Sequence, residues 1–181
     1  PDDDVPDDDD PEPDPPEVLL INSLSAHGWL EQTAMDGARV RLLHAIAEKD
    51  HLRRLRVFVP YSGAKPIYVH AKLMIVDDAI LRVGSANMNN RSMRLDTECD
   101  VTIDAAHPGN EGAAGEIRAL RDSLLAEHLG VPAEKVAAAI EAKGSLIEAV
   151  EALRGDGRSL RPYEIPDLEE VEKWLADNQV L

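Results

Sequence analysis

The chain has 181 residues, a length that suits one domain with a single hydrophobic core. Hydrophobic residues make up 44% of it, and no apolar run approaches the roughly 20 residues of a membrane-spanning helix, so the composition is that of a globular protein. The net charge of −16 is concentrated in residues 1–17, which hold ten acids and no base, while 25 acids and 19 bases leave the rest mildly acidic. This balance argues against bulk non-specific binding of nucleic acid.

Three stretches of different composition suggest how the chain is organised. Residues 1–17 consist almost wholly of proline and acidic residues, which cannot form a core, so we expect a disordered acidic linker there. Residues 18–130 combine strand and helix patterns, and residues 131–181 read as a helical C-terminal extension. This order predicts an α/β fold, with a mixed β-sheet flanked by helices. Because the chain starts with proline rather than methionine, we expect a fragment or a processed chain.

The patterns of apolar residues and turn residues predict the elements in chain order. Strands are expected over residues 18–22, 55–59, 67–76, 79–83 and 98–103. Helices are expected over residues 29–49, 111–129, 133–142, 144–154 and 167–177. Pro60 is expected to stop the second strand, and Gly130 to end a helix. Asp77-Asp78 marks a turn, which predicts a hairpin between the third and fourth strands.

The most informative segment is His70-Ala71-Lys72, in the predicted strand 67–76. Because side chains alternate along a strand, His70 and Lys72 should share one face, while Ala71 and Leu73 point into the core. Burying an imidazole and an ammonium without partners is costly, so we expect their face to open onto a cleft. The pair suits phosphate chemistry, since lysine neutralises phosphate oxygens and histidine exchanges protons or attacks phosphorus near neutral pH. Taken alone, such a pair is more typical of an exposed strand edge.

Further polar residues follow in an order that strengthens this interpretation. Gly84 lets backbone amides approach an anion, and Ser85 adds a hydroxyl group. Asn87 offers an amide donor, and Glu98 on the next predicted strand is suited to hold the second nitrogen of His70 and fix its tautomer. Individually, Asn87 reads as a turn residue and Glu98 as a solvated strand charge. The ordered set, rather than any single residue, indicates a site for a phosphate ester.

The pattern His-x-Lys-x-x-x-x-Asp, followed by Gly-Ser-x-Asn, resembles the signature of the phospholipase D superfamily, its HKD motif. The matching residues are His70, Lys72, Asp77, Gly84, Ser85 and Asn87. Residues 89–92 and 96–98 are similar to the continuation of that family's second motif. Residues 27–31 and 53–60 resemble the preceding region of bacterial phospholipase D-like proteins. The resemblance extends over residues 18–155.

The resemblance implies a phospholipase D-like catalytic half-domain over residues 18–130. It implies a metal-independent, cofactor-free phosphodiesterase that hydrolyses or transfers phospholipid head groups through a phosphohistidine. One histidine attacks phosphorus and a second protonates the leaving alcohol; by its place in the second motif, His70 would be the second, with Glu98 orienting it. Asp77 would have a structural role, holding the strand end or a neighbouring charge, rather than carry a proton. The phosphate oxygens would be bound by Lys72, Ser85 and Asn87.

The family uses two such motifs, and this chain has one. None of its other histidines has a lysine two residues later: His27, His44, His51, His107 and His128. We therefore expect a partner, either the missing N-terminal half of a longer chain, which we favour, or a second copy related by a two-fold axis. Phospholipid is the expected substrate, with peripheral membrane contact and a cytoplasmic or membrane-surface location. Three alternatives stay open: a nuclease of the same superfamily, which the mildly acidic body disfavours, a catalytically incomplete phosphate- or lipid-binding half, and a helical interaction module in residues 111–181.

Overall fold

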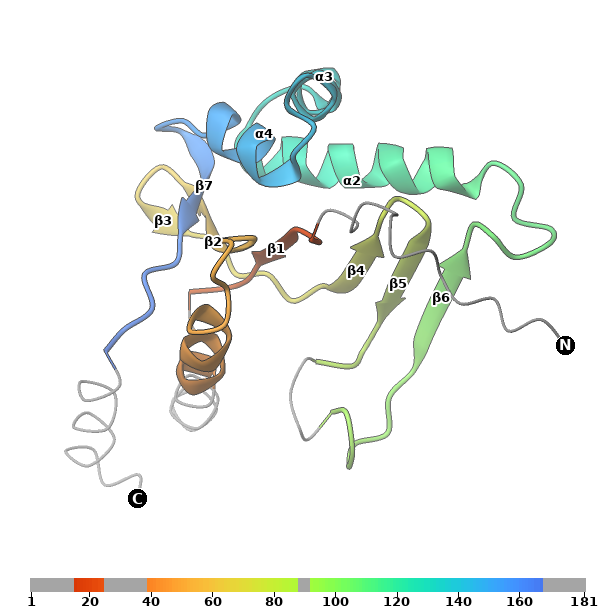
Figure 1. The fold of residues 1–181 in the computed structure, drawn as a ribbon, viewed down its shortest axis with the longest axis horizontal. Coiled ribbons are helices and arrows are strands. Elements are labelled where there is room, and N and C mark those ends of the chain that lie inside the picture. The colour runs from red at the N-terminus through yellow and green to blue at the C-terminus, as the bar shows by residue number, and fades with distance from the viewer. Residues whose placement is uncertain (1–14, 25–38, 88–91, 168–181) are drawn as a thin grey trace, which may run out of the picture.

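Residues 15–24, 39–87 and 92–167 are described by the structure, which is a computed structural model. Over these ranges the chain forms two β-sheets and four helices, and the predicted α/β fold is confirmed (Figure 1). Some predicted features lie outside the described residues. These are most of the acidic linker, the first part of the helix expected over residues 29–49, and nearly all of the helix expected over residues 167–177.

The first sheet is organised around β2 (Leu55–Ser62). β1 (Val18–Ile21) pairs with it in parallel, and β3 (Lys65–Pro66) and β7 (Arg158–Pro162) pair with it antiparallel. β1 and β3 follow one another along one edge of β2, where the carbonyls of Phe58 and Pro60 accept hydrogen bonds from the amides of Asn22 and Ile67. β7 lies along the other edge. The sequence did not predict β7, because its residues, Arg-Ser-Leu-Arg-Pro, lack an apolar alternation.

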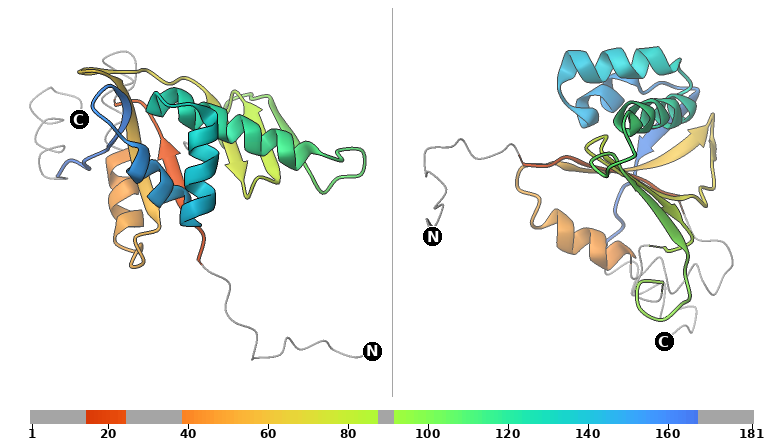
Figure 2. Two further views of the ribbon diagram at one scale, coloured as in Figure 1. Left: turned by 90° about the horizontal axis from the view of Figure 1, so that it is seen from above. Right: turned by 90° about the vertical axis from the view of Figure 1, so that its right-hand side faces the viewer.

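The main core lies between this sheet and three helices, α2 (Ala113–Leu129), α3 (Ala133–Lys143) and α4 (Leu146–Leu153). These helices cover one side of the sheet, and a helix over residues 39–47 lies on the other side (Figure 2). As predicted, α2 ends at Gly130, which adopts a left-handed conformation with φ of 67°. Each buried aliphatic or aromatic side chain contributes roughly 1.5–3 kcal/mol. The largest buried cluster consists of Phe58, Leu125, Ala126, Leu129, Val136, Val150 and Leu160.

The second sheet is an antiparallel meander of β4 (Lys72–Val76), β5 (Ile80–Gly84) and β6 (Asp100–Asp104). The predicted hairpin between β4 and β5 is confirmed. Residues 67–71 lead from the first sheet into the second without belonging to either. Helix α2 runs along both sheets (Figure 1), and near its middle Arg121 forms an ion pair with Asp78 in the β4–β5 turn at 2.5 Å.

Three predictions about the strands are wrong in detail. β2 continues through Pro60, because the proline nitrogen faces the edge of β2 between the pairings with β1 and β3, where no strand requires an amide donor. The strand expected over residues 67–76 begins only at Lys72, so His70 precedes it. The strand expected over residues 98–103 runs from Asp100 to Asp104, so Glu98 precedes it.

The core predicted beneath the third strand is also absent from the described part of the chain. Ala71 is exposed and Leu73 is 38% exposed, because α2–α4 pack chiefly against the first sheet. The second sheet therefore extends from the core with much of its apolar surface uncovered by the described residues.

Glu17, the last residue of the expected linker, caps helix α4. Its carboxylate accepts hydrogen bonds from the Ser145 hydroxyl at 2.7 Å and from the Leu146 amide at 2.8 Å. Arg54 pairs with it at 3.4 Å. Burial acts to raise the pKa of the Glu17 carboxyl, but the hydrogen bonds from Ser145, Ile147 and Leu146, together with Arg54, lower that pKa below its ordinary value. The ionised carboxylate therefore stabilises the start of α4.

We predict that Glu17→Gln lowers the free energy of unfolding at pH 7 by about 1 kcal/mol, the usual contribution of a helix cap. Because the folded-state pKa is depressed, this contribution is present above the unfolded carboxyl pKa and is lost as pH falls through the folded value. Urea unfolding at pH 7 and pH 3 should show a difference between the two proteins that shrinks at pH 3. Glu116→Gln, an exposed acid in the first turn of α2, is the control and should have a smaller effect. An equal loss in both variants would contradict the capping role.

Candidate active site

The structure brings His70 and Lys72 together at the start of β4. The Lys72 ammonium lies 3.0 Å from Nε2 of His70 and donates a second hydrogen bond to the His70 carbonyl at 2.8 Å. Since an ammonium group only donates, Nε2 must be the accepting, unprotonated nitrogen of the ring. His70 is exposed, and its ring stacks on Tyr68 with the centroids 5.9 Å apart. An exposed imidazole beside a cation is a suitable place for a phosphate group.

Ser85 and Glu98 form a second pair at the same end of the sheet. The Ser85 hydroxyl donates to the Glu98 carboxylate at 2.6 Å and accepts the Cys99 amide at 3.0 Å. The Ser85 amide donates to the Cys99 carbonyl at 3.1 Å, so these contacts close the base of the loop between β5 and β6. Glu98 thus binds Ser85, and its role in orienting His70 stays a prediction. Asn87 lies exposed further along this loop.

The strand register explains why the two pairs lie at one end of the sheet. Gly84 is paired with Lys72 on one side and with Asp100 on the other. A Cβ atom on Gly84 would lie 1.8 Å from Oδ1 of Asp100 and 2.7 Å from its Cα, so only glycine fits there. Asp100 also pairs with Arg82 at 3.0 Å and accepts the Ala86 amide at 3.4 Å. Sequence reasoning missed Arg82 and Asp100, whose shared face follows only from the register.

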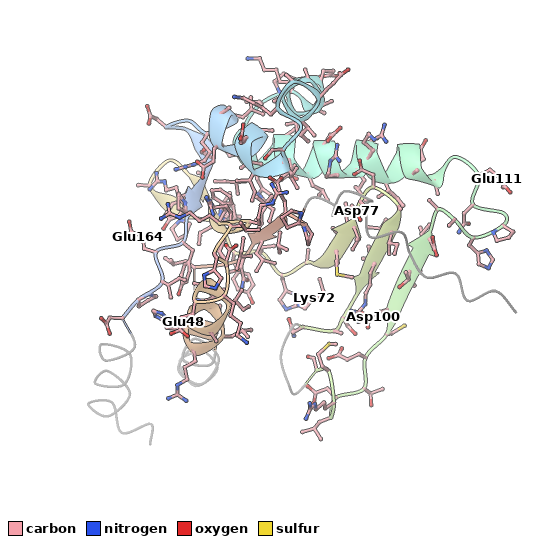
Figure 3. The ribbon with its side chains drawn as sticks, in the orientation of Figure 1. Glu48, Lys72, Asp77, Asp100, Glu111 and Glu164 are labelled. Atoms are coloured by element: carbon pink, nitrogen blue, oxygen red, sulfur yellow. The ribbon has the colours of Figure 1, made fainter. Side chains whose placement is uncertain are left out.

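Asp77 lies at the opposite end of β4 from Lys72 (Figure 3), about 17 Å away at 3.3 Å per residue. Asp77 and Asp78 both have positive φ, 50° and 55°, and form the hairpin turn that the Val76 carbonyl closes with the Ala79 amide. The carboxylate that pairs with α2 belongs to Asp78, which contacts Arg118 at 3.2 Å as well as Arg121. The site prediction passed over Asp78, and the position of Asp77 supports a structural role for it.

Ser23 is a further residue near the site that the sequence did not single out. It follows β1, is only 6% exposed, and forms two hydrogen bonds with the backbone of Val69, the residue before His70. The signal was a polar pair, Asn22-Ser23, directly after a short apolar parallel strand, a position that often faces a binding site.

A family model described as phospholipase D matches residues 55–156, more than half of the chain. The chain therefore belongs to the phospholipase D family. The matched range contains the residues of both pairs, together with Asp77 and Asn87.

Known relatives agree with this assignment. A phospholipase D alpha 1 of Spuriopimpinella brachycarpa is 46% identical over 69 residues, covering 36% of this chain and 8% of the relative. A phospholipase D alpha 1 of Carica papaya is 45% identical over 69 residues, with the same coverage. A phospholipase D alpha 2 of Oryza sativa subsp. japonica is 46% identical over 70 residues, covering 36% of this chain and 9% of the relative. The chain thus spans less than a tenth of the length of these relatives. They are plant proteins, so the resemblance to bacterial members stays a prediction.

We predict that Gly84→Ala destabilises the protein by about 2 kcal/mol or more, because the added methyl group overlaps both the side chain and the backbone of Asp100. Gly115→Ala in α2 is the matched control: its Cβ meets open space, and the change should stabilise the helix by about 0.5–1 kcal/mol. Urea unfolding followed by circular dichroism measures both. Wild-type stability in Gly84→Ala would show that Asp100 is not seated against Gly84.

Proposed function

We propose that this chain supplies the second His/Lys motif of a phospholipase D-type phosphodiesterase. The proposed enzyme hydrolyses phospholipid head groups, or transfers them to another alcohol, through a phosphohistidine. The observation that carries this proposal is the 3.0 Å contact between the Lys72 ammonium and Nε2 of His70, in a chain of this family. The phospholipid substrate is supported by family membership.

In this proposal a phosphate oxygen replaces Nε2 of His70 as the acceptor for Lys72, which frees the imidazole. The nucleophilic histidine of the other motif forms a bond to phosphorus while the bond to the leaving alcohol oxygen breaks. Protonated His70 gives its proton to that oxygen. Neutral His70 then takes a proton from water or an acceptor alcohol, whose oxygen bonds to phosphorus as the phosphorus–nitrogen bond to the nucleophilic histidine breaks, which restores both histidines.

The remaining residues of the motif have supporting roles in the proposal. Ser85 and Asn87 bind phosphate oxygens, and Ser85 lies in hydrogen-bond contact with Glu98. Glu98 holds the site in register through Ser85, and orients His70 as the substrate binds. Asp77 shapes the β4–β5 turn. No metal or cofactor is assigned a role.

We predict that His70→Ala in the two-motif protein lowers head-group release by about 10²–10⁴-fold, the usual contribution of a general acid and base. His107→Ala, a change of another exposed histidine, should leave the rate unchanged. Release of head groups from phosphatidylcholine vesicles measures the effect, with a single-stranded DNA substrate run in parallel. Unchanged release in His70→Ala would refute the assignment, vesicle binding without turnover would favour the binding-only alternative, and turnover of DNA alone would favour the nuclease.

Peripheral contact with a phospholipid surface is part of the same proposal, because vesicles present the head groups there. The loop between β5 and β6 carries two exposed apolar residues, Met93 at 58% and Leu95 at 83%, at the end of the sheet that holds Lys72. Among the described residues, no helix has the length and apolar character to cross a bilayer. The vesicle assay above tests the contact through sedimentation of the protein with the lipid.

In this proposal the other His/Lys motif comes from a partner, and the second sheet offers a surface for one. The register places six aliphatic residues on one face, four of them 38–64% exposed, opposite the face that carries Lys72 and Asp100. We propose that the N-terminal half of a longer chain covers this face, and that a second copy does so when the 181-residue chain is alone. The six residues are Leu73, Ile75, Leu81, Val83, Val101 and Ile103.

We predict that the 181-residue chain self-associates and that Val101→Lys weakens this association about tenfold or more, because an ammonium group would be desolvated at the interface. Leu52→Lys is the control, since Leu52 is 67% exposed in the turn before β2, outside this face. Sedimentation equilibrium over a range of concentrations measures both. A chain that stays monomeric up to high concentration, or equal association of Val101→Lys and wild type, would contradict the proposal.

A further inference from the structure

His70 lies where the chain passes from one sheet to the other. Along one edge of β2, β1 ends at Ile21 and β3 ends at Pro66, and neither residues 22–24 nor residues 67–71 belong to a strand. The segment before His70 therefore lacks the ladder of hydrogen bonds that would normally fix its direction. Ile67 is tied to the Pro60 carbonyl at 2.8 Å, and regular pairing resumes at Lys72. Val69 lies between Ile67 and Lys72, so the contacts that hold Val69 decide where the His70 imidazole lies.

One side chain binds both backbone polar groups of Val69. The Ser23 hydroxyl accepts a hydrogen bond from the Val69 amide at 2.8 Å and donates one to the Val69 carbonyl at 3.0 Å. Because Ser23 is 6% exposed, water has little access to replace these bonds. Because the amide and the carbonyl of Val69 belong to the peptide groups on its two sides, the Ser23 hydroxyl holds both of these groups, which fixes the backbone at Val69 more firmly than a single bond would.

Ser23 is itself held firmly. Its amide donates to Oδ1 of Asn22 at 2.8 Å, and its carbonyl accepts from Arg39 at 3.0 Å. The Asn22 amide donates to the carbonyl of Phe58, a residue of the buried core, at 2.9 Å. The Arg39 guanidinium also lies 5.1 Å from the centroid of the Tyr163 ring. The position of the hydroxyl is therefore set by β2, by the helix over residues 39–47 and by the segment after β7.

We propose that Ser23 is a positioning residue for His70. By clamping the backbone of Val69, its hydroxyl fixes the direction in which the chain enters His70 and keeps Nε2 beside the Lys72 ammonium. The inference rests on the proposed function, since a phosphate group must find His70 and Lys72 together. The cost of misplacing such a group is large: about 1 Å can reduce a rate roughly 10²-fold.

The test uses Ser23→Ala in the 181-residue chain, with Ser159→Ala as the matched control. Ser159 is another buried serine, 1% exposed, whose hydroxyl accepts a backbone amide, that of Gly155, at 3.0 Å. It lies on β7, on the far edge of β2 from Ser23, so both variants lose a buried hydroxyl but only one touches the site. Urea unfolding first establishes conditions in which both variants are folded.

Two readouts follow, the ¹⁵N chemical shifts of the His70 ring, which report tautomer and hydrogen bonding, and the affinity for inorganic phosphate. We expect Ser23→Ala to shift the His70 resonances and to weaken phosphate binding about tenfold, within the range for loss of positioning. Ser159→Ala should leave both as in the wild type. Wild-type resonances and wild-type affinity in folded Ser23→Ala would overturn the inference.

The outcomes separate this inference from the proposed function. If His70→Ala and Lys72→Ala bind phosphate as well as the wild type, the phosphate site fails, whereas a shift of the His70 resonances in Ser23→Ala still supports positioning. If Ser23→Ala does not fold, Asn22→Ala carries the test, because Asn22 is exposed and its side chain accepts the Ser23 amide. Displaced His70 resonances in that variant support the inference, and wild-type resonances overturn it.

Discussion

The antiparallel register of the second sheet is the constraint on which the candidate site depends. Lys72, Gly84 and Asp100 are paired across three strands, and this pairing puts the His70–Lys72 pair and the Ser85–Glu98 pair at the same end of the sheet. A slip of one residue would send Lys72 to the aliphatic face, because side chains alternate along a strand. Glycine at position 84 permits this register, since the Cβ atom of any larger residue there would collide with Asp100.

The two sheets differ in their structural roles. The first is buried beneath α2–α4 and supplies most of the described core, around Phe58 and Leu160. The second carries the candidate site and is anchored at two places: Ser23 holds the segment before His70, and Asp78 ties the distal turn to Arg121 of α2. His70 and Ser85 remain exposed at one end of this sheet, so the site groups are accessible from outside the described core.

The sequence and the structure differ most where local pattern and long-range packing compete. The run Ile67–Val76 reads as one strand, yet regular pairing starts at Lys72, because residues 67–71 bridge two sheets. Pro60 reads as the end of a strand, yet β2 continues because nothing at that edge needs its amide. Asp77 and Asp78 are adjacent acids in one turn, and no local rule indicated that only Asp78 would face the arginines of α2.

The sequence by itself determined the α/β class, the bounds of α2, α3 and α4 to within two residues, the β4–β5 hairpin and the family, since these depend on local periodicity, turn chemistry and a short ordered motif. It also singled out His70 and Lys72, whose spacing of two residues nearly guarantees that they are neighbours. Only the tertiary structure decided that Glu98 contacts Ser85, that Asp100 sits against Gly84, and that Ser23 holds Val69 from 46 residues away. Those contacts join segments distant in the chain, and their geometry is set by strand register and core packing, which local pattern does not specify.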